Sequence, residues 1–231
     1  MEADNTLYKL RNFEFEFLQD ILGKNNFGNV LEIGPGKFPI NKFINVTKYL
    51  GIEKSNQNLE SEVYTITDID KNRLSDVETV FALNSIYFIE DIEKFYLELE
   101  SLNPNCFIYI LPTSSWRFWT TISAYIAFFT KKSKHKQNII NNSSNSFLDK
   151  LFLKRHGIRG NRFNELFYYR KNYWEYLFLN LHQGYEIKTK NIKIFYTGFN
   201  IFGDKISLSL RSKISNFLGC SSRLYILSKK N

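Results

Sequence analysis

The sequence predicts an α/β protein built on an open, mostly parallel sheet with helices on both faces. Three observations favour this class: an apolar run at 29–33 opens directly into Gly34-Pro35-Gly36, a second apolar run ends at Glu53, and short apolar runs alternate with helix-like segments. Such alternation is typical of βαβ units, whose helices cover both faces of a parallel sheet. We expect the 231 residues to form a single domain.

Helix-like and strand-like segments alternate along the chain. Residues 8–22 have apolar side chains at helical spacing and precede Gly23, a common helix stop, so a helix is expected there. Strands are expected at 29–33 and 48–53, with a helix-like connection at 41–46. Further strands are predicted at 62–69, 77–83, 106–111, 185–196 and 222–227, and further helices at 90–102, from about 116, at 165–181 and at 205–218.

Composition excludes several classes of protein. A hydrophobic fraction of 43% with 23% charged residues is incompatible with wholesale disorder, and no apolar run reaches the roughly 18 residues of a membrane span. Cys106 and Cys220 have no C-x-x-C spacing, so neither a disulfide framework nor a metal site is expected, and a reducing cytoplasm is the expected location. The net charge of +8 favours an anionic partner.

The glycine segment carries the most specific signal. Glycines let backbone amides approach a ligand closely, and an acid about 20 residues after the turn, here Glu53, suits ribose hydroxyls. Pro39 replaces the third glycine of a dinucleotide fingerprint, and Glu32 would repel a pyrophosphate, so a cationic, phosphate-free ligand fits better. The alternative interpretation is a tight turn after a core strand.

The pattern E-x-G-x-G at 32–36 resembles that of the class I S-adenosylmethionine-dependent methyltransferases. The resemblance implies a Rossmann-like seven-stranded sheet and S-adenosyl-L-methionine (SAM) as cofactor. It places Glu32, Gly34 and Gly36 at the methionine part of SAM and Glu53 at the ribose. It also implies a SAM-binding half at 25–112, acceptor-side helices with a mobile loop at 113–184, and C-terminal strands with a helix at 185–231.

The resemblance extends to the segment at 82–91, which is similar to the strand-four region of small-molecule methyltransferases. It implies that Asn84 and Ser85 lie beside the cofactor or the acceptor; the alternative is a strand-ending turn with a helix N-cap. Asp68, near the end of the third strand, is the expected contact to the adenine amino group. Its alternative role is that of a solvated turn carboxylate.

The C-terminal half resembles a methyltransferase subgroup encoded among bacterial surface-polysaccharide genes, which implies O-methylation of a sugar hydroxyl on a nucleotide- or lipid-linked glycan precursor. His156 is the first candidate base because histidine titrates near neutrality. Glu165 is a candidate to orient His156 or to act as the base itself. Surface, capping or packing roles are the alternatives. Candidates to hold an acceptor phosphate or carboxylate, or to stack on a sugar, are Trp116, Arg117, Arg155 and Arg159.

Two other functions stay open. The apolar segment at 120–129, followed by KKSKHK at 131–136, suits methylation of a lipid or quinone at the inner face of an anionic membrane. The other alternative is a non-catalytic RNA- or membrane-binding protein. Nucleic acid is not favoured, because 84–87 reads N-S-I-Y where methyltransferases of base amines carry an N/D-P-P-Y/F motif. Residues 131–146 are polar and predicted to form the mobile loop.

Overall fold

The computed structural model describes residues 2–23, 26–53, 63–65, 76–86, 89, 92–129, 165–198 and 205–230. These residues form a seven-stranded sheet with the order β3-β2-β1-β4-β5-β7-β6. Its strands are β1 (Asn29–Ile33), β2 (Lys48–Glu53), β3 (Val63–Thr65), β4 (Thr79–Leu83), β5 (Cys106–Pro112), β6 (Tyr185–Ile192) and β7 (Ser222–Lys229). The first five pair in parallel, whereas β7 runs antiparallel to β5 and β6. The predicted fold class is confirmed.

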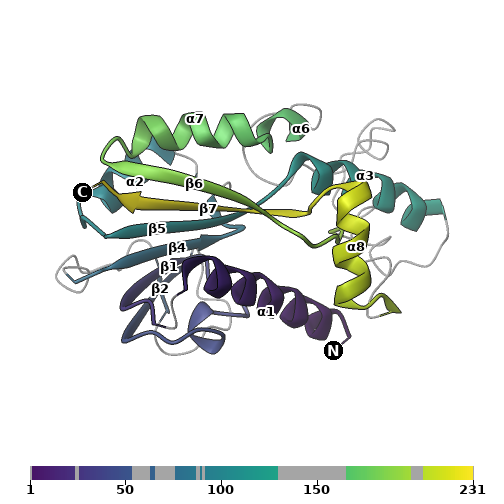
Figure 1. The fold of residues 1–231 in the computed structure, drawn as a ribbon, viewed down its shortest axis with the longest axis horizontal. Coiled ribbons are helices and arrows are strands. Elements are labelled where there is room, and N and C mark those ends of the chain that lie inside the picture. Colours follow the sequence, from purple (N-terminus) through teal and green to yellow (C-terminus); the bar gives the residue numbers. More distant parts are fainter. Residues whose placement is uncertain are drawn as a thin grey trace.

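Helices cover both faces of the sheet (Figure 1). They are α1 (Glu2–Leu22), the 3-10 helix η1 (Ile40–Lys42), α2 (Ile92–Glu100), α3 (Ser114–Phe129), α6 (Glu165–Tyr168), α7 (Lys171–Leu181) and α8 (Leu208–Leu218). One face carries α2, α6 and α7, and the other carries α1, while α3 and α8 lie together at one end. Among the described residues, no helix combines the length and apolarity that a membrane crossing requires.

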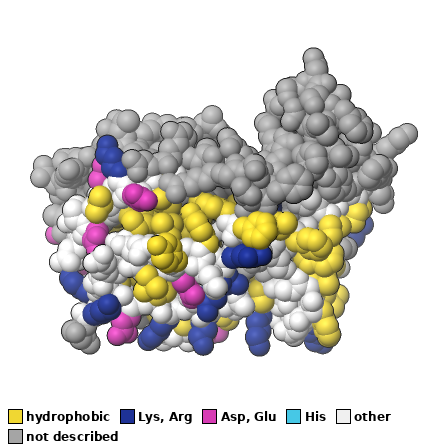
Figure 2. Space-filling model, turned by 90° about the horizontal axis from the view of Figure 1, so that it is seen from above, with side chains coloured by type: hydrophobic (Ala, Val, Ile, Leu, Met, Phe, Trp, Pro, Cys, Tyr) yellow, Lys and Arg dark blue, Asp and Glu magenta, His cyan; other side chains and the backbone are white. Residues whose placement is uncertain are grey.

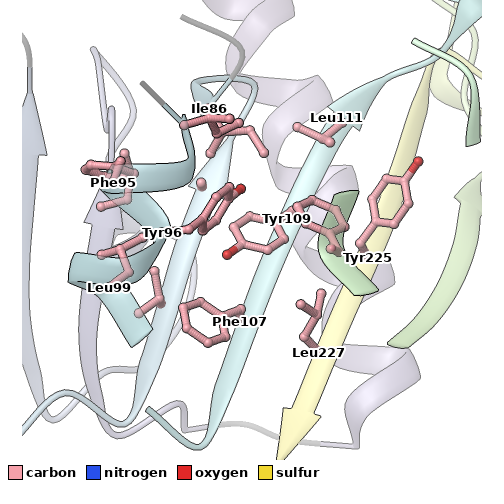
Figure 3. Packing of buried hydrophobic residues seen from close by; sticks show 14 of the residues in the cluster. Ile86, Phe95, Tyr96, Leu99, Phe107, Tyr109, Leu111, Tyr225 and Leu227 are labelled. Carbon is pink, nitrogen blue, oxygen red and sulfur yellow. The ribbon is translucent and has the colours of Figure 1, made fainter. Parts of the chain in front are cut away.

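The central strands divide their side chains between two cores. β4 and β5 are buried along their whole length, as expected of parallel strands covered on both faces. Phe107, Tyr109 and Leu111 of β5 face the core under α2 and α7, which Figure 3 shows, whereas Ile108 and Ile110 face the core under α1. This two-sided burial explains why the strand reads as an uninterrupted apolar run.

The connection after β1 differs from the prediction. The sequence predicts a helix at 41–46, but only the single turn of η1 forms. The chain leaves η1 at once to pair with the segment before β1: the N–H of Phe27 donates to the carbonyl of Asn45 (3.1 Å) and the N–H of Thr47 to that of Gly28 (2.8 Å). These hydrogen bonds occupy the residues that a longer helix would need.

Other boundaries shift less. The helix predicted at 165–181 is interrupted at Arg170, which has extended backbone (φ −71°, ψ 145°) and separates α6 from α7. The N-cap predicted before the helix at 116 is confirmed, because the Thr113 hydroxyl accepts a hydrogen bond from the N–H of Trp116 (3.1 Å). The predicted loop at 131–146 lies outside the described residues.

A buried histidine lies in the core under α7. His182, immediately after α7, is 0% exposed and is surrounded by rings, with the centroid of Phe107 at 4.3 Å and that of Tyr96 at 4.9 Å. Its Nε2 lies 3.3 Å from the Tyr109 hydroxyl. Burial lowers the pKa of His182 to about 4, so the ring is neutral in the fold near neutral pH.

We expect His182 to make the fold acid-sensitive. Its folded pKa lies below the ordinary value, so its stabilising contribution is complete above about pH 6.5 and is lost as pH falls towards 4. Urea unfolding should show a loss of about 2 to 3 kcal/mol between neutral pH and mildly acidic pH that the variant His182→Leu lacks. Equal pH dependence in the two proteins would contradict the assignment.

Candidate active site

The glycine turn lies where the parallel strands end. Gly34 and Gly36 both have positive φ, +71° and +58°, and the N–H of Gly34 donates to the carbonyl of Ile52 at the end of β2 (2.7 Å). The two glycines have different surroundings. A Cβ on Gly34 would lie 2.5 Å from the Cβ of Ser85, whereas a Cβ on Gly36 would meet no described residue within 4 Å. Gly34 therefore permits close packing, and the described residues leave space beside Gly36.

The turn after β4 packs directly against the glycine turn. The Ser85 hydroxyl donates to the carbonyl of Ile33 (2.5 Å), and the N–H of Asn84 donates to the carbonyl of Ile110 in β5 (2.8 Å). Asn84 itself has φ +55°, a conformation that asparagine tolerates better than most residues. The structure thus brings Gly34 and Ser85, predicted to share a site, into contact.

Glu53 lies beside the open side of the turn. It ends β2, is partly exposed, and its Oε2 accepts a hydrogen bond from the N–H of Gly36 (3.2 Å). The glycine turn and the second-strand acid are therefore adjacent in space. A partly solvated carboxylate beside an unobstructed backbone is the arrangement that a vicinal diol, such as a ribose, would be expected to need.

Glu32 has a different environment from Glu53. It is 1% exposed, and its Oε2 accepts from the N–H of Ile40 and from the Tyr49 hydroxyl, both at 2.8 Å. Burial raises the pKa of Glu32 to about 7, against the opposing effects of these two hydrogen bonds and of the charge of Arg11. Glu32 ties η1 to β1 and so holds the chain that leaves the turn. Its contact with a cofactor stays a prediction.

Arg117 and Glu165, both predicted on the acceptor side, form an ion pair with each other. Arg117 Nη2 lies 2.5 Å from Glu165 Oε2, and the two side chains are only 4% and 1% exposed. The pair connects α3 to the start of α6. Trp116 is also buried and packs edge-on against Tyr169, with a centroid distance of 6.1 Å. The catalytic and acceptor-binding roles of these three residues stay predictions.

Four predicted site residues lie outside the described residues: Asp68, Arg155, His156 and Arg159. Their roles also stay predictions. Within the described ranges, no group of three or more His, Cys, Asp or Glu side chains is placed to hold a metal ion.

A buried polar cluster that the sequence analysis missed lies between α1 and the C-terminal strand. Glu14 is 2% exposed; its Oε1 accepts from the hydroxyls of Ser222 (2.5 Å) and Tyr196 (3.2 Å), and its Oε2 from Arg11 Nη1 (3.0 Å). Ser222 pairs with Pro112 at the end of β5, so the cluster lies at the same edge of the sheet as the glycine turn. The sequence signal that could have revealed this cluster is that Glu14 lies one helical turn after Leu10, on the apolar side of the predicted helix.

The strand order, the reversed β7 and the glycine turn together are those of the class I methyltransferase fold, and solved structures of this fold are similar to the chain. One is the methyltransferase domain of a bacterial Hen1 protein, CtHen1-C (10% identity, TM-score 0.55, covering 96% of this chain and 100% of that one). The small RNA methyltransferase HEN1 has 13% identity and a TM-score of 0.54, and the alignment covers 96% of this chain and 26% of that one.

A third similar structure is the plantazolicin methyltransferase BpumL in complex with SAH, at 11% identity and a TM-score of 0.54, covering 99% of this chain and 89% of that one. No protein-family model matches the chain, and no curated protein matches it. The chain therefore has the class I methyltransferase fold, with sequence identities that speak for the fold alone.

The contact between Gly34 and Ser85 predicts that a second substitution at Ser85 restores part of the stability lost on substituting Gly34. Gly34→Ala should lower the free energy of unfolding by about 2 kcal/mol or more, because it adds a steric clash to an unfavourable positive φ. Gly36→Ala, with the same backbone strain but no clash, should cost only about 1 kcal/mol. Adding Ser85→Gly should recover part of the Gly34→Ala loss in urea unfolding. A purely additive double variant would contradict the contact.

The Arg117–Glu165 ion pair predicts that the effects of the two residues on stability are strongly coupled. Arg117→Met should cost about 3 to 5 kcal/mol, because it leaves the Glu165 carboxylate buried without its guanidinium. The double variant Arg117→Met/Glu165→Leu should be much more stable than either single variant, as measured by a double-mutant cycle in urea. Single variants of wild-type stability would contradict the structural role of the pair.

Proposed function

We propose that the chain is a SAM-dependent methyltransferase whose cofactor binds over the glycine turn. The observation that carries the proposal is the position of Glu53 beside Gly36, at the carboxyl ends of the strands of a class I methyltransferase fold. Ligands of open α/β sheets bind in the crevice outside these strand ends. The space next to Gly36 would admit the methionine part of the cofactor close to the backbone, and Glu53 would accept hydrogen bonds from ribose hydroxyls.

The described residues support the cofactor in three ways. Glu53 offers acceptor oxygens for a diol, and Gly36 offers a backbone without a side chain. Glu32 holds the chain between the glycine turn and η1 in place through its hydrogen bond with the N–H of Ile40. When bound, SAM supplies a methyl group activated by its positively charged sulfur. The Glu53 carboxylate at this edge is compatible with a cationic ligand and unfavourable for a pyrophosphate.

For the acceptor we retain a sugar hydroxyl of a nucleotide- or lipid-linked glycan precursor, as the subgroup resemblance implies. The similar structures are named for small RNA and for plantazolicin, so their acceptors differ and do not favour one class for this chain. Transfer to a hydroxyl forms a carbon–oxygen bond, breaks the carbon–sulfur bond and releases the hydroxyl proton. His156 is the first proposed proton acceptor, and Glu165 is proposed to orient His156 or to accept the proton itself.

Calorimetry tests the cofactor proposal. S-adenosylhomocysteine should bind the wild-type chain, and Glu53→Ala should weaken binding by about tenfold or more through loss of charge-assisted hydrogen bonds to the ribose. Glu98→Ala, an exposed acid on α2, is the matched control and should bind like the wild type. Absence of binding to folded wild-type protein would overturn the proposal, and unchanged binding by Glu53→Ala would overturn the role of Glu53.

A further inference from the structure

The helix α8 exposes two large apolar side chains to solvent. Arg211 and Ser215, one helical turn apart, are its buried residues, whereas Leu210 and Phe217 are 47% and 88% exposed. Arg211 is buried with its Nη1 donating to the carbonyl of Phe195 (3.1 Å). Arg211 and Ser215 thus lie on the protein side of α8 together with the partly buried Leu208, whereas Leu210 and Phe217 leave apolar surface exposed to solvent.

The first turns of α3 lie beside the end of α8. Leu218, at the end of α8, accepts hydrogen bonds on its carbonyl from the hydroxyl of Ser115 (2.5 Å) and from Nε1 of Trp119 (2.9 Å). Phe118 is 48% exposed, and its ring centroid lies 5.2 Å from that of Trp119. We define the α3–α8 surface as Phe118, Leu210, Lys213, Phe217 and Leu218; Figure 2 shows hydrophobic side chains at this end of the molecule.

The charge of this surface has one sign. Neither α3 nor α8 contains Asp or Glu, and Lys213 is exposed one helical turn from both Leu210 and Phe217. The exposed apolar side chains of α7, Tyr176 and Leu179, lie on a helix that carries both signs of charge, because Lys171 and Glu175 form an ion pair there (3.3 Å). Exposed apolar side chains beside a lysine, on two helices that carry no acidic residue, are the chemistry that an anionic bilayer surface attracts.

We propose that the α3–α8 surface binds an anionic lipid bilayer, with Phe217 and Leu210 entering the headgroup region and Lys213 meeting the lipid phosphates. The surface flanks the candidate active site, because β5 runs directly into α3 and α8 runs directly into β7 at the carboxyl edge of the sheet. A bilayer bound there would deliver a lipid-linked acceptor to that edge. Bilayer binding itself does not require the proposed methyltransferase activity, so the two proposals can fail separately.

Vesicle sedimentation with the full chain tests this proposal. The wild type should sediment with phosphatidylcholine vesicles that contain phosphatidylglycerol and much less with phosphatidylcholine alone. Phe217→Ser and Lys213→Glu should each weaken binding to the anionic vesicles by about tenfold. Tyr176→Ser, which removes a 70% exposed ring from α7, is the matched control and should bind within about twofold of the wild type.

Circular dichroism and titration with S-adenosylhomocysteine identify variants that have lost the fold or the cofactor site rather than the surface. Failure of the folded wild type to bind anionic vesicles would overturn the proposal, as would equal losses for Phe217→Ser and Tyr176→Ser. A wild-type dimer that Phe217→Ser abolishes, without vesicle binding by either protein, would instead assign the surface to a second copy of the chain. Retention of RNA without vesicle binding would also overturn it.

Discussion

The approach of two turns at the carboxyl edge of the sheet is the constraint on which the candidate site depends. The turn after β1 and the turn after β4 touch through Gly34 and Ser85, at a distance that no additional Cβ would permit. The Ser85 hydroxyl also satisfies the carbonyl of Ile33, so the last residue of β1 keeps a partner as the chain leaves the sheet. This contact sets the direction of the glycine turn and brings Gly36 beside Glu53.

Glu32 provides the second support of the turn. In many proteins with glycine turns a following helix fixes the chain through its own hydrogen bonds, but here only η1 follows. The Glu32 carboxylate binds the N–H of Ile40, at the positive end of that short helix, and the Tyr49 hydroxyl of the neighbouring strand. The buried Glu32 side chain thus supplies hydrogen bonds that a following helix would otherwise supply. This role explains why an acidic residue occupies a position in the hydrophobic strand β1.

Sequence reasoning succeeded where the signal is local and periodic. The buried runs of β1 and β5 and the position of Glu53 at the end of β2 follow from apolar patterns that are read within a few neighbouring residues. It could not reveal that Glu14 meets Ser222, or that Arg117 meets Glu165, because residues far apart in sequence become neighbours only through the packing of helices. The short η1 was missed for the same reason, since its length depends on pairing with the segment before β1.

The buried ionic groups raise the question of what they contribute. A buried ion pair commonly returns no more free energy than its desolvation costs, so stability alone does not account for Glu14 inside an otherwise apolar interface. Arg11 belongs to α1 and moves with Glu14, but the two hydroxyl donors, Tyr196 and Ser222, come from the C-terminal part of the chain. An interface of leucine and phenylalanine alone would tolerate a shift of α1 along the sheet, whereas Glu14 would then lose the hydrogen bonds from Tyr196 and Ser222. We infer that the cluster fixes the position of α1 at the edge where the glycine turn lies.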